Sequence, residues 1–163
     1  MSIQFSAGEV FEMAEQIERN GVKFYKSAAK NARNEGVKNL LIEMSETEAS
    51  HEQTFIEMRK ELTAEEEAKT VFDPDNEIVY YLQAISDSHG WEGMAAPEME
   101  LTGHESIDEI LNCAIKAERG SIEFYLGMEE SVSARHGKEK IRAVIREEMS
   151  HVAMLQKKLN ELK

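Results

Sequence analysis

One pattern of glutamate, tyrosine and histidine occurs twice in this chain, and the second copy lies 100 residues after the first. In each copy a glutamate is followed seven residues later by a tyrosine and thirty residues later by a Glu-x-x-His motif. The eight residues are Glu18, Tyr25, Glu48 and His51, then Glu118, Tyr125, Glu148 and His151. Such a repeat predicts two similar structural units related by an approximate two-fold axis.

Each unit is predicted to contain two α-helices. Apolar residues recur every three or four positions over residues 6–33, 37–62 and 106–132, and again over 141–162, as one face of a helix requires. At the start of each unit a serine precedes a glutamate by three residues, which is the capping-box pattern of a helix start. The Glu-x-x-His motifs fall within the apolar stripes, so their side chains are expected to point into the core.

A long segment, residues 63–105, separates the two repeat units at 6–62 and 106–162. Short breaks within each unit predict antiparallel hairpins, whereas residues 63–105 are far too many for a turn. This segment is therefore expected to cross the length of the bundle, with a short helix over 78–85 and an irregular loop over 91–103. The prediction is an all-α protein, an antiparallel four-helix bundle with a long crossover.

The repeated residues indicate a metal site. Four glutamates and two histidines in an apolar core are costly unless cations bind them. One glutamate from each of two helices, with a Glu-x-x-His motif from each of the other two, is the ligand set of carboxylate-bridged two-metal bundles. We predict that the ligands are Glu18, Glu48, His51, Glu118, Glu148 and His151. Each metal would receive one terminal glutamate and one histidine, and two carboxylates would bridge. This donor set favours two Fe ions, with Mn or Zn as substitutes.

Residues one or two helical turns away from these ligands admit more than one role. Tyr25 and Tyr125 share a face with the preceding glutamates, which suits either a hydrogen bond from the phenol to a ligand carboxylate across the site or simple aromatic packing. Glu15 lies one turn before Glu18 and could support a ligand or replace one.

Glu147 is a competing candidate, because it lies four residues before His151 and so shares its helix face. Its counterpart in the first copy is Thr47, so the repeat selects Glu148 instead. On this reasoning Glu147→Ala should leave metal occupancy nearly unchanged. Any one of these acids alone would be a solvated residue of a helix face; it is the repeated combination that favours a metal site.

Length and composition favour one domain over residues 1–163, large enough to bury a core. The net charge of −13 argues against nucleic-acid binding, which depends on neutralising phosphates. This charge either attracts cations such as Fe²⁺ or simply keeps the helix faces solvated. Cys113, the one cysteine, predicts a reducing cytoplasmic location, and no apolar segment approaches the length of a membrane span.

At these residues the chain resembles the ferritin-like superfamily of di-iron carboxylate proteins, and it is similar to its rubrerythrin-related members. The resemblance implies reduction of hydrogen peroxide or dioxygen, or oxidation of Fe²⁺, and hence a role in oxidative stress. Two departures stand out. Rubrerythrins carry an additional glutamate where this chain has Ser121, and a four-cysteine rubredoxin-like module where this chain has a single cysteine. An external electron donor, a rubredoxin-like protein or a flavoprotein, is therefore expected.

The favoured interpretation is an enzyme, a non-haem di-iron oxidoreductase acting on H2O2 or O2. A ferroxidase or iron-handling protein of ferritin type is the first alternative, and a metal-binding bundle without turnover is the second. The aromatic and methionine content of residues 63–105 also suggests a homodimer that buries part of the crossover.

Overall fold

The computed structural model describes residues 5–68, 75, 77–89, 101–132, 135 and 137–163. Within these residues the protein is all-α and has no strand, which confirms the predicted fold class. The six helices are α1 (Ala7–Asn31), α2 (Glu35–Lys60), α3 (Ala64–Ala68), α4 (Glu77–His89), α5 (Ile107–Ser131) and α6 (Lys138–Glu161). In this part of the chain no helix is both long and apolar enough to cross a membrane.

The helix starts of the two repeat units are nearly identical. At the N-terminus of α1, the Ser6 hydroxyl accepts a hydrogen bond from the Glu9 amide, and the Glu9 carboxylate accepts one from the Ser6 amide. Ser106 and Glu109 form the same reciprocal pair at the start of α5. These contacts satisfy amide groups that have no partner within the helix, so the predicted capping boxes are confirmed.

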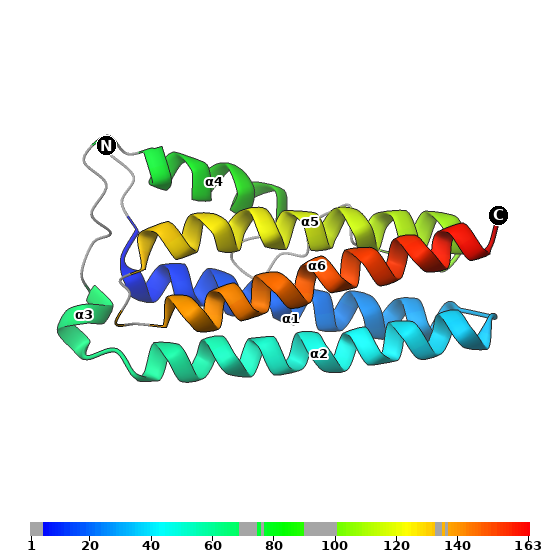
Figure 1. Cartoon of the computed structure of the whole chain (residues 1–163), viewed down its shortest axis with the longest axis horizontal. Helices are drawn as coiled ribbons and strands as arrows, with labels where there is room; N and C mark the ends of the chain where they lie inside the picture. The colour runs from blue at the N-terminus through cyan, green and yellow to red at the C-terminus, as the bar shows by residue number, and fades with distance from the viewer. Residues whose placement is uncertain (1–4, 69–74, 76, 90–100, 133–134, 136) are drawn as a thin grey trace.

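Helices α1 and α2 form one antiparallel hairpin and α5 and α6 form the other, with their long axes roughly aligned (Figure 1). Helix α2 begins two residues earlier than the apolar pattern predicts. The side chain of Asn34 accepts a hydrogen bond from the Val37 amide at 3.0 Å and so caps the helix. Gly137, whose φ is +93°, precedes α6 in a backbone conformation that favours glycine.

The core of the bundle consists of two apolar clusters. One is built from residues of 10–17, 55–62, 124–132 and 141–145, with Leu82 of α4. The other is built from residues of 24–29, 37–44, 110–114 and 155–159. The polar residues of the repeated pattern occupy the intervening positions of all four long helices. Two apolar layers therefore enclose a polar layer at the middle of the bundle.

The described part of the crossover contains two helices rather than the one predicted. Helix α4 includes the predicted helix 78–85 and lies along α5 (Figure 1), where the Tyr81 hydroxyl donates to the Glu123 carbonyl oxygen at 2.7 Å. The short helix α3 was not predicted, although Thr63 and Glu66 form a capping box at its start. Most of the predicted irregular loop 91–103 lies outside the described residues, namely residues 91–100.

Candidate metal centre

The structure brings the six predicted ligands together in the polar layer of the bundle. Each long helix contributes to the layer: Glu18 from α1, Glu48 and His51 from α2, Glu118 from α5, and Glu148 and His151 from α6. All six side chains are buried. They face inward because they continue the apolar stripes of their helices, with steps of three or four residues.

These side chains form two overlapping groups that could each hold a metal ion. The first group is Glu18, Glu48, His51 and Glu148, and the second is Glu48, Glu118, Glu148 and His151. In each group the candidate ligand atoms all lie within 4.8 Å of one another. Glu48 and Glu148 belong to both groups. They occupy the bridging positions, whereas each remaining glutamate and each histidine belongs to one group alone.

Both histidines turn their Nδ1 atoms toward the carboxylates. His51 Nδ1 lies 2.9 Å from Glu148 Oε1 and 3.6 Å from Glu18 Oε2. His151 Nδ1 lies 3.0 Å from Glu148 Oε2, 3.3 Å from Glu48 Oε1 and 3.4 Å from Glu118 Oε2. The two rings are 5.9 Å apart and inclined by 28°. This arrangement presents a nitrogen from each side to a central cluster of oxygens.

Several polar atoms of the cluster lack an aligned hydrogen-bond partner although they are fully buried. Among the described residues these atoms include Glu18 Oε2, Glu48 Oε1, Glu148 Oε1 and His51 Nδ1. Buried polar atoms are normally paired, and an unpaired carboxylate oxygen is costly. Two divalent cations would give these atoms partners and would balance four carboxylates. The residues present therefore fit a pair of metal ions.

The protonation of the cluster shows how strongly it departs from a solvated acid surface. Burial raises the pKa of Glu18 and Glu118 well above the ordinary value, and the nearby carboxylate of Glu48 raises it further. Burial also disfavours ionised Glu148, but hydrogen bonds from Glu118 and both histidines lower its pKa. Burial would lower the pKa of the histidines, yet their close contacts with the carboxylates raise it to about 11 for His51 and about 12 for His151.

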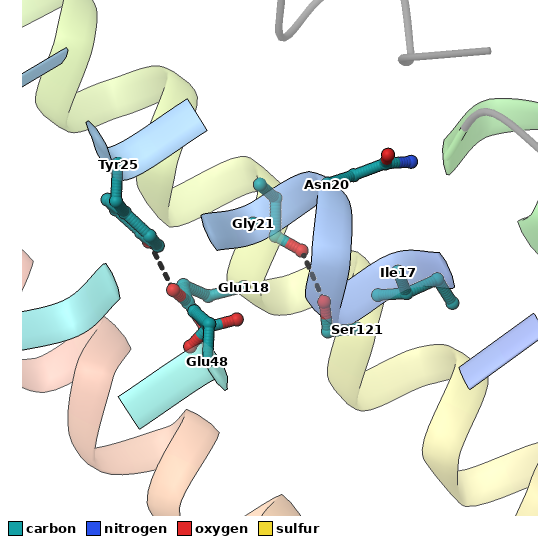
Figure 2. A pocket seen from close by; sticks show the side chains of 8 residues that line it. Ile17, Asn20, Gly21, Tyr25, Glu48, Glu118 and Ser121 are labelled. Carbon is teal, nitrogen blue, oxygen red and sulfur yellow. Dashed lines mark hydrogen bonds between the residues drawn. The ribbon is translucent and has the colours of Figure 1, made fainter. Parts of the chain in front are cut away.

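The two tyrosines of the repeat each donate a hydrogen bond across the site. The Tyr25 hydroxyl donates to Glu118 Oε1 (Figure 2), and the Tyr125 hydroxyl donates to Glu18 Oε1. Burial, followed by the charge of the same carboxylate, raises the pKa of each phenol well above its ordinary value. Both phenols therefore remain donors, and each fixes the orientation of a terminal glutamate from the opposite repeat unit.

Glu147 has a contact that sequence reasoning missed. Its Oε2 lies 2.8 Å from Nε2 of His51, the ring nitrogen that faces away from the cluster. Glu147 belongs to neither ligand group, and 58% of its side chain is exposed. A carboxylate on the far nitrogen orients a histidine and makes it a better ligand. Thr47 holds the corresponding place in the first unit, where its hydroxyl donates to the Glu43 carbonyl oxygen.

Glu15 does not join the cluster. Arg59 Nε lies 2.8 Å from Glu15 Oε1, and Arg59 Nη2 donates to Glu15 Oε2 at 3.1 Å. Arg59 also pairs with Glu12. Glu15 is thus a buried partner of an arginine, and the structure places it in neither candidate metal group. Sequence spacing could not distinguish this ion pair from support of a ligand.

Comparison with known proteins agrees with this geometry. The family model for rubrerythrin matches residues 9–105, which is more than half of the chain and includes Glu18, Glu48 and His51. No curated protein matches. A crystal structure of a ferritin-like diiron-carboxylate protein from Thermotoga maritima superposes over 100% of both chains, with a TM-score of 0.74 and 17% identity, and so shares the fold. By its sequence match, this chain belongs to the rubrerythrin family.

Proposed function

We propose that this protein is a non-haem di-iron oxidoreductase that reduces hydrogen peroxide, or dioxygen, at a carboxylate-bridged pair of metals. The observation that carries the proposal is the sharing of Glu48 and Glu148 between two ligand groups, each completed by its own glutamate and histidine. Two ions held by shared carboxylates act on one small substrate together. Membership of the rubrerythrin family supports the same chemistry.

Iron is the metal that best joins this donor set to redox chemistry. Carboxylate oxygens and imidazole nitrogens suit iron and manganese, and Zn²⁺ binds similar ligands without redox activity. Bound as a ferrous pair, the metals would supply the two electrons that, with two protons, break the O–O bond of one peroxide and yield two waters. That the native metal is iron is therefore part of the proposal.

The protein's own residues would hold, orient and enclose this centre. Tyr25 and Tyr125 hold the terminal carboxylates Glu118 and Glu18 in place through their hydroxyl groups. The apolar clusters above and below the polar layer exclude bulk water, which strengthens electrostatic interactions inside it. His51 and His151 must each give up a proton to bind metal, because the metal takes the neutral ring nitrogen.

Electrons for repeated turnover would come from a separate donor. The chain's one cysteine, Cys113, cannot build a four-cysteine iron site. We propose that a rubredoxin-like protein or a flavoprotein supplies the electrons from outside residues 1–163.

A homodimer in which the crossover is partly buried remains part of this proposal, and Tyr80 of α4, 58% exposed, is available for such a contact.

The test begins with metal analysis of protein purified without added metal and then loaded anaerobically with Fe²⁺. We expect two irons per chain, and faster oxidation of the reduced protein by peroxide than by dioxygen in stopped-flow mixing. Glu48→Gln should lose iron and this reaction, whereas Glu46→Gln, at an exposed position of the same helix, should lose neither. A protein that binds no iron, or whose reduced form reacts with neither oxidant, would refute the proposal.

Particle size and iron capacity distinguish this reaction from iron storage of the ferritin type. The proposed chemistry is complete within one bundle, so a small oligomer with iron saturating near two per chain is expected. Light scattering should report a particle no larger than a few chains. A particle of tens of chains, whose iron content rises far beyond two per chain in air, would favour iron handling instead.

A further inference from the structure

A narrow pocket lies between α1 and α5, beside the candidate metal centre (Figure 2). Its lining includes Asn20, Gly21, Tyr25, Glu48, Glu118 and Ser121. Asn20 and Ser121 keep 6% and 7% of their surface exposed, whereas Glu118 and Glu48 keep 2% and 3%. Figure 2 shows the side chain of Asn20 turned away from the two carboxylates. Ala117, also in the lining, is partly exposed, so the pocket extends from the position of Ala117 inward to the carboxylates.

The pocket reaches one side of the centre only. Of the six candidate ligands, Glu48 and Glu118 line it; Glu48 is shared by both ligand groups, whereas Glu118 belongs only to the group that contains His151. Glu18, the terminal glutamate of the other group, is not part of the lining. The two metal positions would thus differ in access, although the repeat makes their ligands the same. A molecule entering here meets the position beside His151.

Gly21 leaves the space of the pocket open because it has no side chain. A Cβ atom at position 21 would lie 2.8 Å from Glu48 Oε2, closer than such atoms approach in proteins, and 3.3 Å from Glu48 Cγ, which is a tight contact. On the facing helix, Ser121 occupies the repeat position equivalent to Gly21. Its hydroxyl donates to the Ala117 carbonyl oxygen at 3.2 Å, so that the hydroxyl stays on its own helix. A small residue on each helix keeps the passage between α1 and α5.

The dimensions and walls of the pocket restrict what can enter. Its volume is about 10 Å³, close to the least space in which one water can be held. Ile17 and Ala117 give the lining an apolar part, and Glu48 and Glu118 place carboxylates at its inner end. A space this small leaves no room for the hydration shell of an ion, so it disfavours charged molecules. Any molecule larger than one water must displace side chains to pass, and this displacement is smallest for an uncharged molecule of two heavy atoms and large for a branched organic hydroperoxide.

The geometry points to this pocket as the route by which an uncharged, peroxide-sized oxidant reaches the metal position beside His151, with Gly21 and Ser121 setting the size limit. This inference rests on the proposed function and adds to it a direction of approach and a basis for substrate selection. Gly21 and Ser121 limit entry through the small size of their side chains, since neither is a candidate metal ligand. Ser121 is not a candidate ligand, so a larger side chain at position 121 fills the passage from α5 while all six candidate ligands are retained.

Nitric oxide is a suitable probe, because it is uncharged, has two heavy atoms, and changes the absorbance of ferrous iron when it binds. The rate of its binding to anaerobic, Fe²⁺-loaded protein would be measured for the wild type, Ser121→Leu and Ser131→Leu. Ser131 is the matched control: it also lies on α5 and its hydroxyl also bonds to a backbone carbonyl, that of Met128 at 2.8 Å, but it does not line the pocket.

We expect Ser121→Leu to keep two irons per chain and to bind nitric oxide roughly tenfold more slowly or worse, because leucine needs more room than one water. Ser131→Leu should bind it at the wild-type rate. Wild-type binding by Ser121→Leu, at full iron content, would overturn the route and leave the proposed function standing. A wild-type chain that takes up no iron would overturn the function and the route together.

A second measurement uses the wild-type chain alone and applies even where Ser121→Leu fails to fold. The reduced, iron-loaded protein would be mixed with hydrogen peroxide and with tert-butyl hydroperoxide. The route predicts that the bulkier peroxide oxidises the iron more slowly by at least about tenfold, since the passage excludes it. Equal rates for the two peroxides would refute a size limit at Gly21 and Ser121.

Discussion

At the scale of single residues, the two candidate metal positions have the same ligands but different surroundings. Glu147 contacts the outer nitrogen of His51, whereas Thr47 stands at the corresponding place in the other repeat unit. The access pocket, in contrast, opens beside the ligands of the His151 position. The His51 position therefore has a carboxylate behind its histidine, and the His151 position is the one that a small molecule can approach. The repeat alone would have made them equivalent.

The contact of Glu147 predicts unequal effects of two matched substitutions. Because of this contact, Glu147→Ala should not leave metal binding unchanged, as the repeat alone predicted, but should weaken it by about 10-fold to 100-fold, the usual effect of losing a carboxylate that orients a histidine ligand. Thr47→Ala removes only a bond to a backbone carbonyl of its own helix and should leave affinity unchanged. Competition against a chelator would measure both. Equal affinities for Glu147→Ala and the wild type would show that the contact does not support the metal.

The protonation of the histidines predicts that metal binding strengthens as pH rises. Hydrogen bonds to the carboxylates, outweighing burial, raise the pKa of His51 to about 11 and of His151 to about 12 in the metal-free protein. Below these values each imidazole carries a proton that must leave before the metal binds. Burial also keeps protons on Glu18 and Glu118. Protons therefore compete with metal over the neutral range, and raising the pH relieves the competition.

Titration calorimetry in two buffers with different heats of ionisation would check this dependence. We expect protons to be released as Zn²⁺, a redox-inactive stand-in, binds at neutral pH, and the apparent affinity to increase from about pH 6 to about pH 8, because this whole range lies below the raised pKa of both histidines. Binding that releases no protons and is equally tight across that range would contradict the assigned protonation of the cluster.

At the scale of helices, sequence periodicity was sufficient for the long elements and insufficient for the short ones. The apolar stripes and the two serine capping boxes located α1, α2, α5 and α6 to within a few residues. Helix α3 was missed because its five residues bury nothing and carry no apolar stripe. Its one signal was the capping box of Thr63 and Glu66. Short helices depend on caps and tertiary contacts more than on periodicity.

The packing of α4 on α5 predicts the effect of one glycine substitution. A Cβ at Gly127 would lie 2.7 Å from the Tyr81 ring and 3.0 Å from Leu82 Cδ2. The hydroxyl of Tyr81 is tied to the Glu123 carbonyl oxygen, so the ring cannot simply turn away. Gly127→Ala should displace α4 and lower the free energy of unfolding by about 1–3 kcal/mol, as overpacking usually does. Iron content should not change.

A double-mutant cycle tests whether the ring is the cause of this loss. In a Tyr81→Ala background, Gly127→Ala should lower the free energy of unfolding much less, because the new methyl group no longer meets an aromatic ring. Denaturant unfolding of the four proteins would give the coupling. The same loss in both backgrounds would mean that α4 is not held against α5 in this way.

At the scale of the whole molecule, the repeat predicted which residues meet, and the packing decided what surrounds them. The six candidate ligands could be selected from sequence because both units carry them in the same helix register. The contact of Glu147 with His51 and the pairing of Glu15 with Arg59 join helices at positions that the two units do not share. No periodicity within one helix reveals such contacts. The pocket between α1 and α5 likewise arises only when the units are packed together.

The most direct test of this account is an anomalous-scattering experiment at the iron edge on crystals of the iron-loaded protein. We predict two peaks in the polar layer of each chain, about 3.5–4 Å apart as in other two-metal sites. One peak should be bound by Glu18 and His51, the other by Glu118 and His151, with Glu48 and Glu148 touching both. A single peak, or two peaks to which neither histidine is bound, would contradict the central claim that the repeated residues form one carboxylate-bridged metal pair.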